Sequence, residues 1–113
     1  MAVDIGPRIG IDGEAEFRKQ INNLTQQVRT FDTELDALSA EMNANGESEE
    51  ASTRKSEILN RAIEAQEQKI QELRRGLEFA ARECGENDER TLKWAQAVNN
   101  AKRRLSQLRN EVN

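Results

Sequence analysis

One stripe of apolar side chains constrains this chain more than any other feature of its sequence. The stripe occupies every third or fourth position from residue 17 to residue 42 without a break. Its members are Phe17, Ile21, Leu24, Val28, Phe31, Leu35, Leu38 and Met42. Alternating steps of three and four average about 3.5 residues, the period of helices that supercoil around one another. Because a helix on a globular core carries a wider apolar face, we predict a long helix that is stable only when paired.

Two further segments carry stripes of the same period. The second runs from Ser52 to Cys84, with serines at its start and Gln66 at its centre. Its large apolar members are Leu59, Ile63, Ile70, Leu73 and Leu77. The third runs from Thr91 to Val112, and its large apolar members before Val112 are Trp94, Val98, Leu105 and Leu108. Three stripes of matching period predict three long helices that pack along their lengths.

Turn and capping residues set the ends of these helices. Gly46 and Gly85 are suited to end a helix, because glycine adopts the left-handed conformation at little cost. Ser48, and then Asn87 or Asp88, can cap the helices that follow. The predicted helices cover about residues 13–44, 49–84 and 88–112. Connections this short require consecutive helices to run antiparallel.

The predicted fold is all-α, an elongated antiparallel coiled-coil or helical bundle of three long helices. Residues 13–113 form this helical module, and residues 1–12, with Gly6, Pro7 and Gly10, form a short extended segment before it. An up-down-up bundle within one chain is the simplest arrangement. The alternative is a helical hairpin whose third helix pairs with another subunit. Because the third stripe is unbroken at Val112, we expect the natural chain to continue beyond this module.

Several positions in the second and third helices have more than one interpretation. An offset stripe of Ile58, Ala62 and Ala65 predicts that the second helix touches two neighbours and is the middle helix of three. Gln66 either fixes the register of packing or is a partly exposed residue on a loosely packed stretch. We interpret Gly76 as tolerated within its helix rather than required for close packing. Cys84 is interpreted as a small core residue. Trp94 is interpreted as a core residue of the bundle.

The composition excludes most kinds of chemistry. The chain has no His and a single Cys, and 34% of its residues are charged. We therefore expect no catalytic activity, no cofactor and no metal site. The net charge of −4 argues against a nucleic-acid surface. The basic cluster Lys102 to Arg104 is better explained by solubility and by the helix dipole. With no run long enough to span a membrane, no signal peptide and a lone Cys, a soluble intracellular protein is expected.

Three segments of the chain resemble bacteriophage tail tape measure proteins. The first is the entry Ile9-Gly10-Ile11-Asp12-Gly13-Glu14-Ala15-Glu16-Phe17, a short strand-like piece that runs into a long helix. The second is the polar break from Asn43 to Glu50. The third is the turn Cys84-Gly85-Glu86-Asn87-Asp88-Glu89-Arg90-Thr91, with Trp94 close behind. The likeness therefore spans most of the chain, from residue 9 to residue 94.

The resemblance implies a structural and assembly role. Such proteins are long and largely helical, lie in a few copies inside the tail tube, and leave it when DNA is delivered. It implies a homo-oligomer that also contacts tail tube, chaperone or tail-end proteins, in the bacterial host cytoplasm during assembly and then in the virion tail lumen. The interface candidates, called the stripe residues below, are the whole first stripe, Ile63, Ile70, Leu73 and Leu77 of the second, and Trp94, Val98, Leu105 and Leu108 of the third.

Two other classes of protein are compatible with parts of this pattern. A bacterial cytoplasmic coiled-coil adaptor that binds one other protein is the main alternative. A secreted helical hairpin with a Trp-x-Gly turn is disfavoured, because Ala95 and Gln96 follow Trp94 inside a helix.

Overall fold

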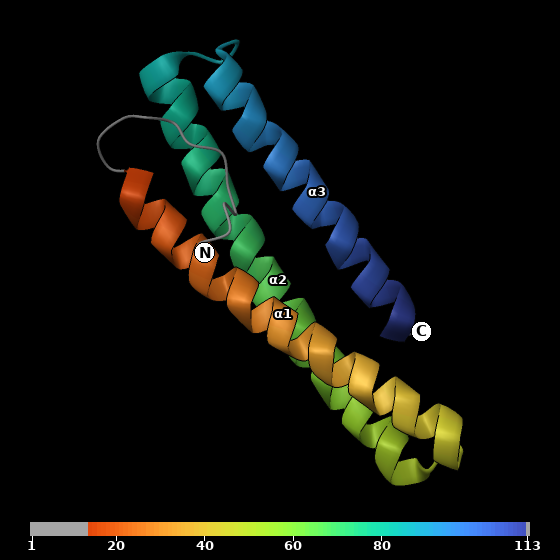
Figure 1. Ribbon diagram of the computed structural model, residues 1–113. Helices are drawn as coiled ribbons and strands as arrows, with labels where there is room; N and C mark the ends of the chain where they lie inside the picture. Colours follow the sequence, from red (N-terminus) through yellow and green to blue (C-terminus); the bar gives the residue numbers. More distant parts are fainter. Residues whose placement is uncertain (1–13, 113) are drawn as a thin grey trace.

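The computed structural model describes residues 14–112, which form three helices (Figure 1). Helix α1 spans Glu14–Asn45, α2 spans Glu49–Cys84 and α3 spans Glu89–Val112. The predicted all-α fold is confirmed, and the helix ends lie within about one residue of the predicted ones. The extended segment predicted over residues 1–12 lies outside the described residues.

Local capping explains where α1 ends and α2 begins. Gly46 has a φ of 84°, and its N–H donates to the Met42 carbonyl at 2.8 Å, which closes α1. The Ser48 hydroxyl accepts a hydrogen bond from the N–H of Ala51 at 3.0 Å and caps α2. Glu49 and Glu50 follow in the first turn, where the helix dipole favours negative charge. The polar break predicted at this position is therefore a tight turn.

The turn between α2 and α3 is also formed by a glycine that ends one helix and a polar side chain that caps the next. Gly85 has a φ of 96°, and its N–H donates to the Ala81 carbonyl at 3.0 Å. The Asp88 carboxylate accepts from the N–H of Arg90 at 2.9 Å and caps α3. The Thr91 hydroxyl donates to the Gly85 carbonyl at 2.7 Å, which fixes the first turn of α3 against the end of α2.

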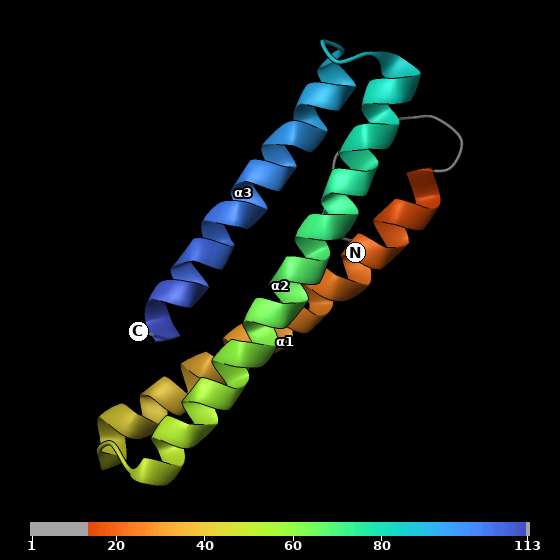
Figure 2. The same cartoon turned by 180° about the vertical axis from the view of Figure 1, so that it is seen from behind.

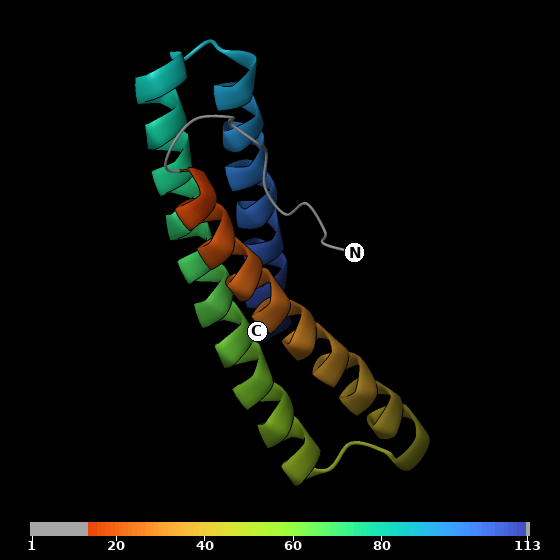
Figure 3. The same cartoon turned by 60° about the vertical axis from the view of Figure 1, so that its left-hand side comes forward.

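Helix α2 is the middle helix of three. Helices α1 and α3 both pack along α2, whereas the Cα atoms of α1 and α3 nowhere approach within 8 Å of each other. Helix α3 has 24 residues against 32 in α1 and 36 in α2, so the α1–α2 hairpin extends beyond it (Figures 2 and 3). The molecule measures 53 × 30 × 16 Å. Of the two predicted arrangements, the structure has the one in which the third helix pairs within its own chain.

Two apolar clusters hold the three helices together, and every helix contributes to both. The first surrounds Trp94 and consists of Ile21, Ile70, Leu73, Ala80, Trp94, Val98 and Ala101. The second consists of Leu59, Ala62 and Leu108, with Phe31, Leu35 and Ile63 packed against it. The core role predicted for Trp94 is confirmed, since its side chain is fully buried. Cys84 is half-buried and packs against the first cluster.

The interpretation of Gly76 as merely tolerated is wrong. A Cβ atom at this position would lie 2.6 Å from Cε3 and 2.7 Å from Cη2 of Trp94, and closer still to Cζ3. Any side chain at position 76 would thus overlap the indole ring. The absence of a side chain lets a ring, rather than a second backbone, approach α2 closely.

Candidate functional site

The stripe residues proposed as interface candidates are turned toward the other helices of the same chain. Nine of them are buried: Ile21, Leu24, Val28, Leu38, Ile70, Leu73, Trp94, Val98 and Leu108. The others are half-buried: Phe17, Phe31, Leu35, Met42, Ile63, Leu77 and Leu105. A partner that binds this structure would therefore contact the edges of the stripes and the surfaces beside them. Two concave surfaces of this kind stand out.

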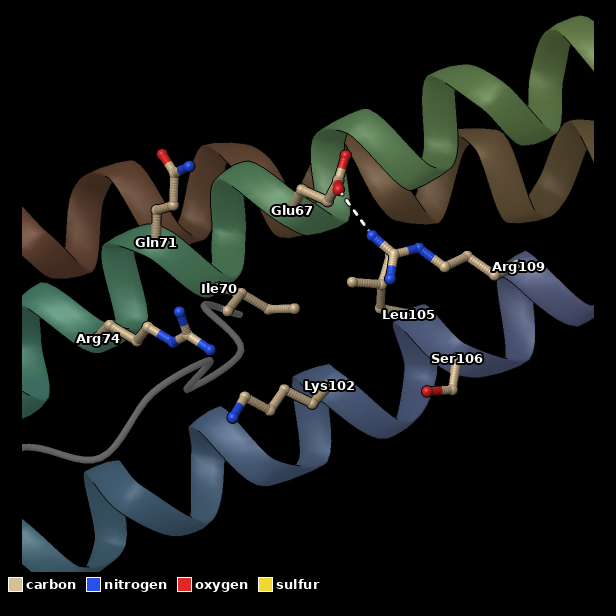
Figure 4. Close-up of a pocket in the computed structure, with 8 residues that line it drawn as sticks. All are labelled: Glu67, Ile70, Gln71, Arg74, Lys102, Leu105, Ser106 and Arg109. Carbon is tan, nitrogen blue, oxygen red and sulfur yellow. Dashed lines mark hydrogen bonds and ion pairs between the residues drawn. The ribbon is translucent and has the colours of Figure 1, made fainter.

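The first surface, here named the outer groove, lies between residues 67–78 of α2 and residues 95–109 of α3. It is lined by α2 and α3 alone, and in Figure 4 α1 lies behind α2. Its floor is apolar. Ile70 and Val98 are buried there, while Leu77 and Leu105 are half-buried and leave part of their surface open.

Charged side chains of the outer groove are arranged unevenly. At one end Arg109 of α3 forms an ion pair with Glu67 of α2 at 2.8 Å (Figure 4). In the middle, Arg74 of α2 and Lys102 of α3 extend into the same gap from opposite sides. Within residues 14–112, neither of these two cations forms an ion pair. The groove therefore places two unpaired positive charges above an apolar floor.

The second surface, here named the inner cleft, lies between α1 and α3 and has α2 as its floor. It is lined by residues 25–32 of α1, 66–73 of α2 and 97–104 of α3. Arg104 donates to the Asp32 carboxylate at 2.6 Å, so this ion pair spans the cleft and joins α1 to α3. Both side chains are almost two-fifths exposed. One member of the basic cluster Lys102 to Arg104 is thus a structural contact.

Gln66 lies at the floor of the inner cleft and is 2% exposed. Its Nε2 donates to the Ala101 carbonyl of α3 at 3.0 Å. Of the two predicted interpretations, partial exposure is wrong, and Gln66 is a buried polar contact between α2 and α3. Its Oε1 and the hydroxyl of the nearly buried Thr25, which also lines the cleft, have no hydrogen-bond partner among the described residues.

The inner cleft also contains Lys69, a lysine whose positive charge is disfavoured by its surroundings. Lys69 of α2 is half-buried and lines the cleft beside Arg29 of α1. Burial lowers the pKa of the Lys69 ammonium group, and the positive charge of Arg29 lowers this pKa further. Both effects mean that the folded protein would be more stable if this lysine were neutral.

The sequence contains no His. Within residues 14–112, no group of Cys, Asp or Glu side chains is placed to hold a metal ion. In the same part of the chain, no helix has the length and apolar character to cross a membrane. The two concave surfaces present exposed apolar edges and charged side chains. Protein–protein interfaces use features of this kind.

No protein-family model, no curated protein and no solved structure matches this chain.

Proposed function

We propose that this chain is a structural and assembly module of a bacteriophage tail tape measure protein. The observation that carries the proposal is the likeness of three segments to that family, combined with a somewhat elongated bundle of three antiparallel helices. The bundle measures 53 Å along its longest direction and 30 and 16 Å along the other two. A protein that lies along a tube needs to be narrow in two directions and extended in the third.

The segments that carry the likeness have defined structural roles where they are described. The polar break from Asn43 to Glu50 is the turn between α1 and α2, and the segment from Cys84 to Thr91 is the turn between α2 and α3. In the second turn, Gly85, Asp88 and Thr91 each make a contact that closes one helix or opens the next.

In this proposal the module acts through contact with other proteins. The partners are further copies of the chain and the tail tube, chaperone or tail-end proteins. The sites of action are the host cytoplasm during assembly and the tail lumen afterwards. Because the stripe residues are covered by the chain's own helices, such contacts use surfaces beside the stripes: the outer groove for a different protein, and the inner cleft and the hairpin end beyond α3 for further copies.

A change in tail length tests the proposal directly. In the phage that encodes the chain, a run of helical heptads would be added in frame to the same open reading frame, outside residues 1–113. We expect tails that are longer in proportion to the insertion when viewed by electron microscopy. Tails of unchanged length in phage that assemble normally would contradict the proposal.

The second candidate function is a bacterial cytoplasmic adaptor that binds one other protein. The unpaired Arg74 and Lys102 of the outer groove favour it, because they suit a single acidic partner. The genes that lie beside the gene for this chain distinguish the two functions. Genes for tail tube and baseplate proteins beside it support the first function, and a setting without tail genes supports the adaptor.

A further inference from the structure

The floor of the outer groove has the spacing that a docked helix requires. Ile70 and Leu77 are seven residues apart on α2, and Val98 and Leu105 are seven residues apart on α3. Each pair therefore lies two turns apart on one face of its helix. An amphipathic helix with apolar residues at similar intervals can lie between these two rows and cover them.

Two cations extend over this floor from opposite sides. Arg74 lies between Ile70 and Leu77 in sequence, and Lys102 lies between Val98 and Leu105. Their side chains extend into one gap from the two helices (Figure 4). At the end of the groove, the contact between the same two helices is the attractive pair Glu67–Arg109. In the middle of the groove Arg74 and Lys102 extend toward each other, and neither forms an ion pair with Glu78, the acidic residue that lines the groove beside Leu77. The two like charges repel each other.

We propose that the outer groove binds an amphipathic helix of another protein, with an acidic side chain of that helix placed between Arg74 and Lys102. A carboxylate at this position would turn one repulsive contact into two attractive ones. The apolar residues of the same helix would cover the open parts of Leu77 and Leu105. This inference stands on the groove itself and does not depend on the phage assignment.

A second copy of the chain is a poor occupant of this groove. A two-fold interface places the same surface against itself. It would bring Arg74 and Lys102 of one copy toward the same two residues of the other, so that four positive charges would gather. An acidic helix of a different protein has no such conflict. The apolar floor also distinguishes the groove from a nucleic-acid-binding surface, because such a surface is built mainly from cations and polar groups.

Designed helical peptides provide the first test. Three labelled peptides would share leucines at heptad positions and differ at one central position, which is Glu, Gln or Lys. Binding to the full chain would be measured by fluorescence anisotropy. Because the Glu peptide gains two solvent-exposed ion pairs and the Lys peptide gains none, we predict that the Glu peptide binds about tenfold more tightly, a difference of about 1.4 kcal/mol. Equal affinities, or no binding by any peptide, would overturn the proposal.

Charge reversal in the chain provides the second test. Lys102→Glu should weaken binding of the Glu peptide several-fold and strengthen binding of the Lys peptide by a similar factor. Arg103→Glu is the matched control, since Arg103 is exposed, adjacent in sequence and outside the outer groove. Circular dichroism of both variants confirms that helix content is retained. An equal effect of the two substitutions would mean that net charge, rather than the groove, governs binding, and this would contradict the proposal.

Sedimentation of the unliganded chain completes the test. We expect the wild-type chain not to associate through the outer groove, so Lys102→Glu should leave its sedimentation coefficient unchanged. A dimer that Lys102→Glu alters while Arg103→Glu does not would assign the groove to a second copy and overturn the proposed occupant.

Discussion

The indole ring of Trp94 in α3 lies against the backbone of Gly76 in α2, in the space that a side chain at position 76 would fill. This contact joins the two helices at the centre of the larger apolar cluster. It couples a residue with an unfavourable helix propensity to the largest side chain of the core. The pair therefore fixes how closely α3 can approach α2.

Gly76→Ala should destabilise the protein although alanine is the better helix former. Alanine gains about 0.8–1 kcal/mol in helix propensity, while overpacking of a tight contact typically costs about 1–3 kcal/mol. We expect a net loss of about 1 kcal/mol in the free energy of unfolding, measured by urea denaturation. Trp94→Leu provides the matched background. In that variant the added methyl group has room, and Gly76→Ala should become stabilising. A stabilising effect in the wild-type background would refute the packing argument.

Gln66→Leu should stabilise the protein. Gln66 makes one buried hydrogen bond to Ala101 and leaves its Oε1 unpaired. Losing that hydrogen bond costs about 1 kcal/mol, whereas burying a leucine contributes about 1.5–3 kcal/mol and removes the unpaired oxygen. We expect a gain of about 1 kcal/mol in chemical denaturation. Gln71→Leu, at an exposed position of the same helix, should change stability by less than about 0.5 kcal/mol. A loss of stability in Gln66→Leu would show that the hydrogen bond outweighs burial.

The ion pair Asp32–Arg104 should contribute only weakly to stability. Both side chains are more than one-third exposed, so solvent screens their attraction. A double-mutant cycle with Asp32→Ala and Arg104→Ala should give a coupling energy below about 1 kcal/mol, decreasing as salt is added. The pair Glu67–Arg109 is more exposed and should give a smaller value. A coupling energy of several kcal/mol that salt does not reduce would contradict this expectation.

Lys69 should make stability rise with pH in the alkaline range. Its pKa is lowered in the folded state by burial and by Arg29, so the unfolded chain binds the proton more tightly. Below the lowered pKa the unfavourable charge is fully present. As the pH rises through that pKa toward the ordinary value of lysine, the folded protein loses the proton first and its free energy of unfolding increases. Lys69→Met should raise stability at neutral pH and remove this rise, as measured by urea denaturation across the range.

The control for this prediction is Lys19→Met, because Lys19 is exposed on α1. It should leave the alkaline rise in place. If Lys69→Met destabilised the protein at neutral pH, the charge of Lys69 would be favourable in the folded state, contrary to the burial and repulsion described here.

Features that depend on local sequence could be predicted, and the helices are the clearest case. The period of the stripes places the buried face of each helix, and Gly46, Ser48, Gly85 and Asp88 set the turns. These signals act within a few residues of the chain. The offset stripe of the second helix also indicated correctly that α2 has two neighbours.

Features that depend on how helices sit beside each other could not be predicted in the same way. Which atoms fill the space next to Gly76 depends on the position of α3, and so does the burial of Gln66. The same holds for the outer groove. Arg74 and Lys102 each occupy a position between two stripe residues, which is a signal that they lie at the edge of a stripe. Only the packing of α2 against α3 places the two edges opposite each other.

The central claim is that the three apolar stripes pack against one another within a single chain. Thermal unfolding over about a hundredfold range of protein concentration tests it most directly, with helix content followed by circular dichroism and the core by Trp94 fluorescence. We predict that both signals change together and that the midpoint does not depend on concentration, because no second chain is needed to cover the stripes and contacts between copies through other surfaces add little to the stability of one module. A midpoint that falls on dilution would mean that the stripes are shared between chains, and it would contradict the account.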